Sequence, residues 1–414
     1  MNDITVQVGS KNFTLSWLEN NPEIKENILV AHKSEEAFCL CIPNKKLPLY
    51  ISQKDKHFLA RFPKTGSEHA PFCPHYDSPT TLSGLSVYKS NAVEENDDGM
   101  FSVKITESIG VNSSSNSESS GSSSSSSSVS GKKRSKMSLQ ALLELLWMKS
   151  GFTRWSPRMS NKRNYFVLYK YLTQAAEEII IKKIPLTEYL YIPEPFVIGR
   201  KDEITRSAEK KHYNLLLSDN GESKRMIAIG LLKNFTKSKY GYRVNIKHLP
   251  GNFSYWLNND HAEKFIDDYC QDGDINSCLS EDSHFVAIMT LDRSKSENLS
   301  VVNLVGITVT RDLLPFSSDK GLRLLAHLKS RIFSVQMDFD ASDTDDLYPD
   351  FLLLDSGIHP TELFIIGSSN NEKRDKKLRN LFQDDVQDAS KNRWCWDLKW
   401  NIDAPPMLPS IYKD

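Results

Sequence analysis

The sequence Cys39-Leu40-Cys41 is followed, on the far side of a predicted β-hairpin, by His69-Ala70-Pro71-Phe72-Cys73-Pro74-His75. The hairpin is indicated by two strand-like segments, residues 49–51 and 57–62, which flank a polar turn at 52–56. The outer ends of two hairpin strands lie side by side. Folding of this segment is therefore expected to bring the two Cys/His clusters together.

The side chains of these clusters are of the types that bind zinc. A structural zinc ion takes four thiolate or imidazole ligands in a tetrahedron. The order of ligands resembles that of the SWIM-type zinc finger, CxC followed by CxH, with a longer spacer here. We assign Cys39, Cys41 and Cys73 as three ligands and His69 as the fourth, with His75 as the alternative. Such an ion would contribute on the order of 10 kcal/mol to folding.

Two other interpretations of the clusters remain open. One is that buried cysteines and surface histidines lie close in sequence by chance. The other is a redox-active pair, which is disfavoured because CxC lacks the CxxC arrangement at a helix terminus that lowers a thiol pKa. The chain has only six cysteines, and their clustering favours metal ligation in a reducing compartment over a disulfide framework. Cys270, Cys278 and Cys395 are interpreted as ordinary thiols.

A serine-rich stretch divides the chain. Serine dominates from Asn112 to Gly131, and a segment with so little to bury is typical of a flexible tether. The 414 residues are also too many for one ordinary core. We therefore predict an α+β, multidomain fold in which a small β-rich zinc-binding domain precedes a larger mixed α/β body. The predicted parts are a zinc-binding domain at 1–108, a disordered, basic, serine-rich linker at 109–137, a basic helical segment at 138–200 and an α/β domain at 201–414.

Apolar spacing predicts the elements of the body. Ser138 is a candidate N-cap for a helix that stops at Gly151, and a second helix is expected from about Asn161. Short β-branched segments then predict a mostly antiparallel sheet. These segments are 226–232, 242–247, 285–291 and 299–310, and a helix at about 319–331 precedes two final strands, 350–354 and 362–366.

Several motifs resemble one bacterial family. They are Cys39-Leu40-Cys41, residues 59–66 and 69–76, Phe152-Thr153-Arg154-Trp155-Ser156-Pro157, residues 190–196, Tyr348-Pro349-Asp350-Phe351 and Trp394-Cys395-Trp396-Asp397. On these motifs the chain looks like a member of domain of unknown function 1173, a family marked by three cysteines near the N-terminus. The family cysteines correspond to Cys39, Cys41 and Cys73. The resemblance implies a link to plasmids and other mobile genetic elements, and so to DNA transfer or maintenance, but no particular reaction.

Basic residues cluster between positions 132 and 183, where lysine and arginine clearly outnumber glutamate. Together with interspersed aromatic residues, such a segment can contact phosphates and stack on bases. A solvated basic face is an equally good explanation of the same pattern. The candidate nucleic-acid contacts are Lys133, Arg134, Arg154, Arg158, Lys162 and Arg163.

The C-terminal part contains a pattern similar to that of PD-(D/E)xK nucleases. Asp350 precedes one predicted strand and Glu362 lies on the next, so both carboxylates are candidate ligands of Mg²⁺. Phe364 occupies the usual lysine position, so a catalytic lysine would have to come from the following helix. We name Lys376 as the candidate, with Lys373 and Lys377 as its neighbours. The alternative is that these acids are turn and surface residues.

Two functional hypotheses follow. In the first, the chain is a DNA- or RNA-associated protein of a mobile element, with a nuclease-like C-terminal region that is either an active Mg²⁺-dependent enzyme or degenerate. In the second, it is a non-catalytic interaction module whose zinc-binding domain docks another protein of the element. No apolar run approaches the ~20 residues of a membrane span and no signal peptide is evident at the start. We therefore expect a cytoplasmic protein without a membrane partner.

Overall fold

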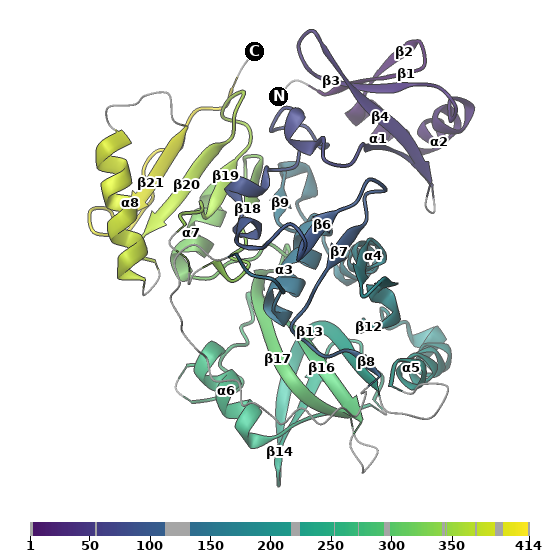
Figure 1. The fold of residues 1–414 in the computed structure, drawn as a ribbon, viewed down its shortest axis with the longest axis vertical. Helices are drawn as coiled ribbons and strands as arrows, with labels where there is room; N and C mark the ends of the chain where they lie inside the picture. Colours follow the sequence, from purple (N-terminus) through teal and green to yellow (C-terminus); the bar gives the residue numbers. More distant parts are fainter. Residues whose placement is uncertain are drawn as a thin grey trace.

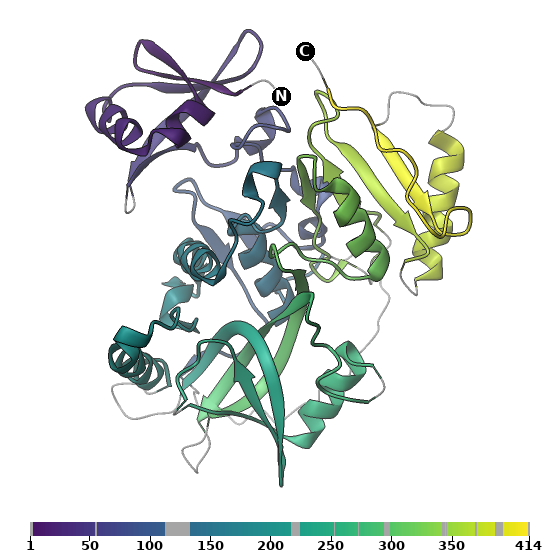
Figure 2. The same cartoon turned by 180° about the vertical axis from the view of Figure 1, so that it is seen from behind.

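Four β-sheets and eight helices form the described part of the chain, which is a mixed α/β protein (Figures 1 and 2). The computed structural model describes residues 3–53, 56–111, 133–216, 224–251, 253–271, 273–293, 299–341, 344, 346–368, 371–385 and 392–412. The helices are α1 (Leu15–Asn20), α2 (Pro22–Ala31), α3 (Leu139–Lys149), α4 (Tyr165–Glu177), α5 (Lys201–Leu216), α6 (Asn259–Tyr269), α7 (Asp319–Leu328) and α8 (Glu372–Asp385). None of the helices within these ranges has the length and apolar character needed to cross a membrane.

The N-terminal sheet has the order β2-β1-β3-β4-β5, with every pair antiparallel. The predicted hairpin is confirmed as β4 and β5, with Leu49 opposite Arg61 and Gln53 opposite His57. Successive side chains of a strand point to opposite faces, and residues of β3 alternate between buried and half-buried positions. The strands are β1 (Thr5–Val8), β2 (Lys11–Thr14), β3 (Ala37–Ile42), β4 (Lys45–Gln53) and β5 (His57–Arg61).

The strands of the segment between residues 80 and 111 pair with the body and not with the N-terminal sheet. Its strands join a second sheet of order β11-β10-β7-β6, and Ile105 and Ile109 are buried in the same core as α3 and α4. Part of the predicted linker, residues 112–132, lies outside the described residues. The flanks of that gap are held in place, because β8 pairs with β13 and Ile105 bridges to Met137. The strands are β6 (Val93–Glu95), β7 (Phe101–Val103), β8 (Gly110–Val111), β10 (Ile179–Ile181) and β11 (Ile184–Pro185).

Side-chain caps start the two central helices. The Ser138 hydroxyl accepts a hydrogen bond from the Ala141 N–H at 3.0 Å, as predicted for α3. The second helix starts at Tyr165 and not near Asn161. Asn161 has a φ of +59°, which a right-handed helix does not accommodate, and Asn164 supplies the cap.

Glu144 on α3 makes the stability of this core depend on pH. Its carboxylate is buried and accepts hydrogen bonds from the Phe339 N–H and from the Gln140 amide. Burial raises the pKa of Glu144 from 4.5 to about 8. The folded state therefore favours the protonated acid. Its stabilising contribution is present below pH 4.5 and is lost as pH rises through about 8.

We expect Glu144→Gln to flatten this dependence, because glutamine keeps the acceptor for Phe339 without a charge. Chemical denaturation at a series of pH values from 5 to 9 should show the free energy of unfolding of the wild type falling relative to the variant. The difference should approach roughly 1.4 kcal/mol per unit of pKa shift. Parallel profiles for the two proteins would contradict the prediction.

The third sheet closes into a small barrel. The sequence indicated four of its strands but not the closure, which comes from one long strand, β13 (Lys224–Ser238). One half of β13 pairs with β16 and the other half with β14, and a register shift lies between Leu232 and Asn234. The remaining strands are β12 (Leu190–Tyr191), β14 (Gly241–Ile246), β15 (Tyr255–Leu257), β16 (Ser283–Arg293) and β17 (Leu299–Thr310).

The C-terminal sheet has the order β21-β20-β19-β18-β9, with β20 and β21 parallel. Leu324, Leu325 and Leu328 of α7 pack in one core with residues of this sheet. Phe364 and Ile366 pack with Leu378 of α8. The strands are β9 (Arg154–Trp155), β18 (Phe333–Val335), β19 (Phe351–Leu353), β20 (Thr361–Ile366) and β21 (Arg393–Asp397).

The N-terminal sheet and the C-terminal sheet lie at one end of the molecule, and the barrel lies at the other (Figures 1 and 2). A common core joins the first two. It contains Cys39, Cys41 and Cys73 together with Ile332 and Leu354 of the C-terminal region. The predicted metal ligands are therefore placed at the contact between the two ends of the chain.

Candidate metal centre

The backbone of β3 presents Cys39 and Cys41 on the same face. Residues two apart in a strand point the same way, and both thiols lie on the buried face, at 0% and 8% exposure. The second pair of ligands comes from the loop that follows β5, in which His69 and Cys73 are 3% and 0% exposed. The antiparallel pairing of β3, β4 and β5 places the end of β5 level with the start of β3, so the loop that follows β5 begins beside the strand that carries Cys39 and Cys41.

The four predicted ligands converge on one point. Their ligand atoms all lie within 4.8 Å of one another. The Sγ atoms of Cys39 and Cys73 are 3.6 Å apart, and Nδ1 of His69 is 3.5 Å from Cys41 Sγ and 3.8 Å from Cys73 Sγ. A tetrahedron with arms of about 2.3 Å has edges of about 3.8 Å. The cluster can therefore hold a metal ion, and its dimensions are compatible with zinc.

The chemistry of the three thiols also favours a cation. The neighbouring sulfurs of Cys39 and Cys41, together with burial, raise the pKa of the Cys73 thiol well above its ordinary value. The Ala70 N–H donates to Cys41 Sγ at 3.3 Å, a bond that suits a thiolate acceptor. Three thiolates this close and this buried repel one another, so a divalent ion is the natural partner that would keep them all deprotonated.

His75 lies beside the cluster but outside the set of four. Its Nδ1 is 3.7 Å from Cys73 Sγ, and its ring centroid is 5.5 Å from that of His69. His69 by contrast approaches two of the sulfurs, those of Cys41 and Cys73, whereas His75 approaches the sulfur of Cys73. The geometry therefore favours His69, with His75 as its neighbour.

Arg154 fastens the ligand loop to the body. Its guanidinium donates to the backbone carbonyls of Pro71, Cys73 and Tyr76 at 3.0, 2.8 and 2.9 Å. Arg154 lies on β9, which pairs with β18 of the C-terminal sheet. One side chain thus links the metal loop to the C-terminal sheet. The sequence pattern suggested a nucleic-acid contact for this arginine and contained no sign of the link.

We expect Arg154→Met to destabilise the protein by roughly 3 kcal/mol, because it removes charge-assisted hydrogen bonds and leaves buried carbonyls without a donor. Thermal unfolding followed by circular dichroism measures the effect. Arg158→Met is a matched control, because Arg158 is exposed nearby. Equal unfolding temperatures for the two variants would show that the hydrogen bonds of Arg154 to the loop do not stabilise the protein.

The six basic candidates fall into two groups. Arg163 donates to the carbonyls of Gly151, Phe152 and Asp312, and Arg134 donates to the Asp340 carbonyl. Like Arg154, these two arginines bind backbone carbonyl groups. The exposed members of the set are Lys133, Arg158 and Lys162.

The two acidic candidates of the C-terminal sheet each have an arginine partner. Both Oδ atoms of Asp350 lie 3.1 Å from the Arg374 guanidinium, and the Ile365 N–H also donates to this carboxylate. Burial raises the pKa of Asp350, against the opposing effect of Arg374. Glu362 accepts from Nε of Arg393 at 3.1 Å. Within the described ranges, the Cys/His cluster is the one group of three or more His, Cys, Asp or Glu side chains close enough to share an ion.

The candidate lysine lies on the helix that was expected to supply it. Lys376 is exposed on α8, next to the buried Asp375. Among the described residues, Lys376 forms no hydrogen bond or ion pair with Asp350 or Glu362, whose partners are Arg374 and Arg393. Lys376 therefore lies on the expected helix but does not contact the two acids.

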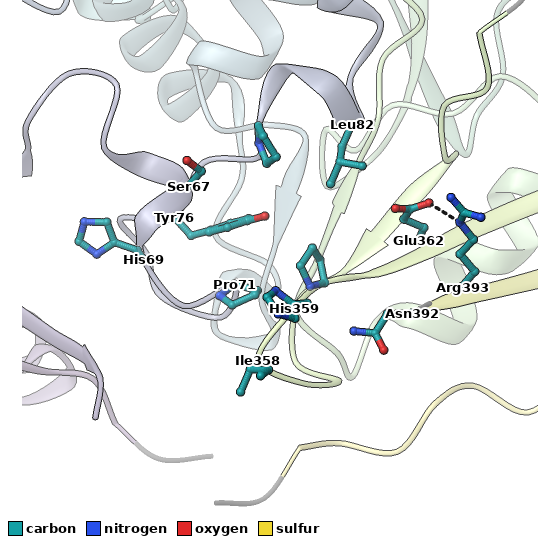
Figure 3. A pocket seen from close by; sticks show the side chains of 12 residues that line it. Ser67, His69, Pro71, Tyr76, Leu82, Ile358, His359, Glu362, Asn392 and Arg393 are labelled. Atoms are coloured by element: carbon teal, nitrogen blue, oxygen red, sulfur yellow. Dashed lines mark hydrogen bonds and ion pairs between the residues drawn. The ribbon is translucent and has the colours of Figure 1, made fainter. Parts of the chain in front are cut away.

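A cavity of about 400 Å³ separates the metal loop from the C-terminal sheet. His69 and Tyr76 line it on one side, and His359, Glu362 and Arg393 line it on the other (Figure 3). Glu362 thus faces the metal loop across this cavity, and its ion pair with Arg393 is visible there (Figure 3).

Fold and cluster together define a mixed α/β protein with a buried Cys₃His ligand set. Residues 13–399 match the family described as "Protein of unknown function (DUF1173)". The match spans nearly the whole chain, so the protein belongs to this family, as its motifs suggested. No curated protein and no solved structure matches the chain.

Proposed function

We propose that the protein is a zinc-stabilised, nucleic-acid-associated protein of a mobile genetic element, with a C-terminal region that is nuclease-like but not catalytic. The observation that carries the proposal is the convergence of Cys39, Cys41, His69 and Cys73 in one buried cluster. The zinc ion is structural in this proposal. Four protein ligands fill a tetrahedron and leave no open position for water or substrate, which a catalytic zinc site needs.

The role of the zinc ion is to order the loop that joins the two ends of the chain. The loop contributes Ala70, Cys73 and Tyr76 to a core that also contains Leu352 of β19 and Leu354, the residue after β19. Arg154, on β9 of the same sheet, binds three backbone carbonyl groups of this loop. Without an ion, the three sulfurs could not all be thiolates in this core, because their negative charges would repel one another.

The order of elements supports the nuclease-like part of the proposal. Helix α7 is followed by the antiparallel strands β18, β19 and β20, then by α8 and the parallel strand β21. Asp350 immediately precedes β19 and Glu362 lies on β20, as the nuclease pattern requires. The arginine partners of both acids favour a degenerate site, because a guanidinium occupies the carboxylate oxygens that Mg²⁺ would need.

Incubation of the full-length protein with plasmid and single-stranded DNA in Mg²⁺ tests the catalytic part. We expect no cleavage above background, and no difference between the wild type and the Asp350→Ala and Glu362→Ala variants. Cleavage that requires Mg²⁺ and disappears in both variants would show that the site is active.

Binding to heterogeneous DNA tests the association. We expect affinity to fall steeply as salt rises, since basic contacts release counterions from the phosphates. If DNA is not bound even at low salt, the protein is better described as a non-catalytic module that docks another protein. Elemental analysis of the same preparation reports on the zinc ion independently of either outcome.

A further inference from the structure

Five strands of the third sheet form a closed ring. Going round the ring, β13 is followed by β14, β15, β17 and β16, and β16 pairs again with β13. Strands β15 and β17 are parallel, and the other neighbours are antiparallel. Helix α6 lies in the chain between β15 and β16. In chain order the ring therefore runs 1-2-3-5-4, the arrangement of the five-stranded Greek-key barrel called the OB-fold.

The strand alternation divides β14 and β15 into an inner and an outer face. Val244, Tyr255 and Leu257 are buried inside the barrel. Arg243 and Trp256 have the opposite parity, and they lie directly across from each other in the register. The Arg243 guanidinium is 5.3 Å from the centroid of the Trp256 ring. Arg243 and Trp256 thus form a cation–π pair on the outer face of the barrel.

The strands and the turn that carry this outer face are basic. Residues 233–257 contain five lysines or arginines and no aspartate or glutamate. Lys239 and Arg243 are exposed, and no ion pair among the described residues involves either of them. Thr236, the cross-strand neighbour of Arg243 on β13, is uncharged. A carboxylate therefore does not neutralise the unit of Arg243 and Trp256 within this register.

The turn between β13 and β14 extends the same pattern. Tyr240 is 76% exposed, and Nζ of Lys239 lies 5.0 Å from the centroid of its ring. Figures 1 and 2 show the tip of this hairpin protruding at the end of the molecule away from the N-terminal and C-terminal sheets. Two cation–π pairs, Lys239 with Tyr240 and Arg243 with Trp256, thus lie on this basic part of the barrel.

We propose that the outer face of β13, β14 and β15 binds single-stranded nucleic acid. Aromatic rings on a basic surface bind bases by stacking and the backbone by charge, and a single strand is the form whose bases are free to stack. Barrels of this kind also bind oligosaccharides. A neutral oligosaccharide has no phosphate groups to pair with the lysine and arginine side chains, so the positive charge favours nucleic acid. The proposal rests on the nucleic-acid association proposed above, and it names the surface and the form of nucleic acid.

Fluorescence anisotropy with a labelled oligothymidine of about 20 nucleotides, longer than the site of one such barrel, tests the proposal on the full-length protein. We expect saturable binding that weakens with salt. Arg243→Glu and Trp256→Ala should each weaken binding by about tenfold or more, whereas Trp256→Phe should retain most of the affinity. Lys239→Glu reverses one charge in the adjacent turn, alters only an exposed side chain and should also weaken binding.

Lys399 and Trp400 provide a matched control. Their side chains form another exposed cation–aromatic pair, with Nζ 4.9 Å from the ring centroid, near the C-terminus. Lys399→Glu and Trp400→Ala should leave binding unchanged. Near-ultraviolet circular dichroism and zinc content check that each variant is folded.

Three results would overturn the proposal. They are undiminished oligothymidine binding by the Arg243, Trp256 and Lys239 variants, a preference for duplex of the same sequence, and competition by polyglutamate as effective as competition by oligothymidine. In the first two cases the protein still binds nucleic acid, through another surface, and the proposed function stands. Absence of binding to any nucleic acid would remove both.

Discussion

Replacement of Cys73 by serine is expected to release the zinc ion and to unfold the N-terminal domain. The free energy of metal binding in a structural site is folding free energy on the order of 10 kcal/mol. Cys73 is fully buried and contacts both Cys39 and His69 within the cluster. Elemental analysis should give one zinc per wild-type chain and none for the variant, and thermal unfolding should start at a clearly lower temperature.

Two further substitutions sharpen this experiment. His69→Ala should lose zinc, whereas His75→Ala should retain it, because His69 contacts two sulfurs of the cluster and is the histidine in the set of four. Cys395→Ser is the matched cysteine control, because Cys395 is half-buried and outside the cluster. A wild-type preparation that is well folded and free of metal would contradict the assignment. Retention of zinc by the Cys73 variant would do the same.

Arg331→Met is expected to destabilise the protein by about 3–5 kcal/mol, the usual cost of removing one partner of a buried ion pair. Arg331 and Asp355 are 7% and 3% exposed, with a shortest distance of 2.8 Å between them. The Arg331 guanidinium also donates to the Pro409 carbonyl at 2.7 Å. The variant would leave Asp355 charged and buried, and it would release the C-terminal segment.

Urea unfolding of the variant and of a surface control measures this cost. Glu203→Gln breaks the exposed ion pair with Arg200 and should leave the free energy of unfolding essentially unchanged. The double variant Arg331→Met with Asp355→Leu should recover part of the loss, because no buried charge remains. Equal effects of the buried and exposed substitutions would contradict the argument.

Local pattern was enough to predict the metal ligands. The CxC motif lies on a strand, where residues two apart share a face, and the hairpin that follows determines where the second cluster goes. Ser138 likewise marks the start of α3 through its own side chain, within three residues. In these cases the partners are close in sequence or are joined by one short hairpin, so spacing and residue type carry the information.

The partners of the charged residues could not be predicted from local pattern. Arg154 looks like part of a basic stretch, and its carbonyl partners are in a loop far earlier in the chain. Asp350 and Glu362 match a nuclease pattern in sequence, yet the residues opposite them are Arg374 and Arg393. A charged side chain has many candidate partners along a chain, and nothing local selects among them.

The sequence by itself determined the Cys₃His set, the family, the hairpin of β4 and β5, and the positions of helices α3, α4 and α7 and of strands β13, β14, β16, β17, β19 and β20. Only the tertiary structure decided that β13 pairs on both of its edges and closes a barrel, and that Arg243 and Trp256 then meet on its outer face. The reason is physical. Alternation and capping act over a few residues, whereas strand closure and ion pairing depend on which distant segments become neighbours when apolar surface is buried.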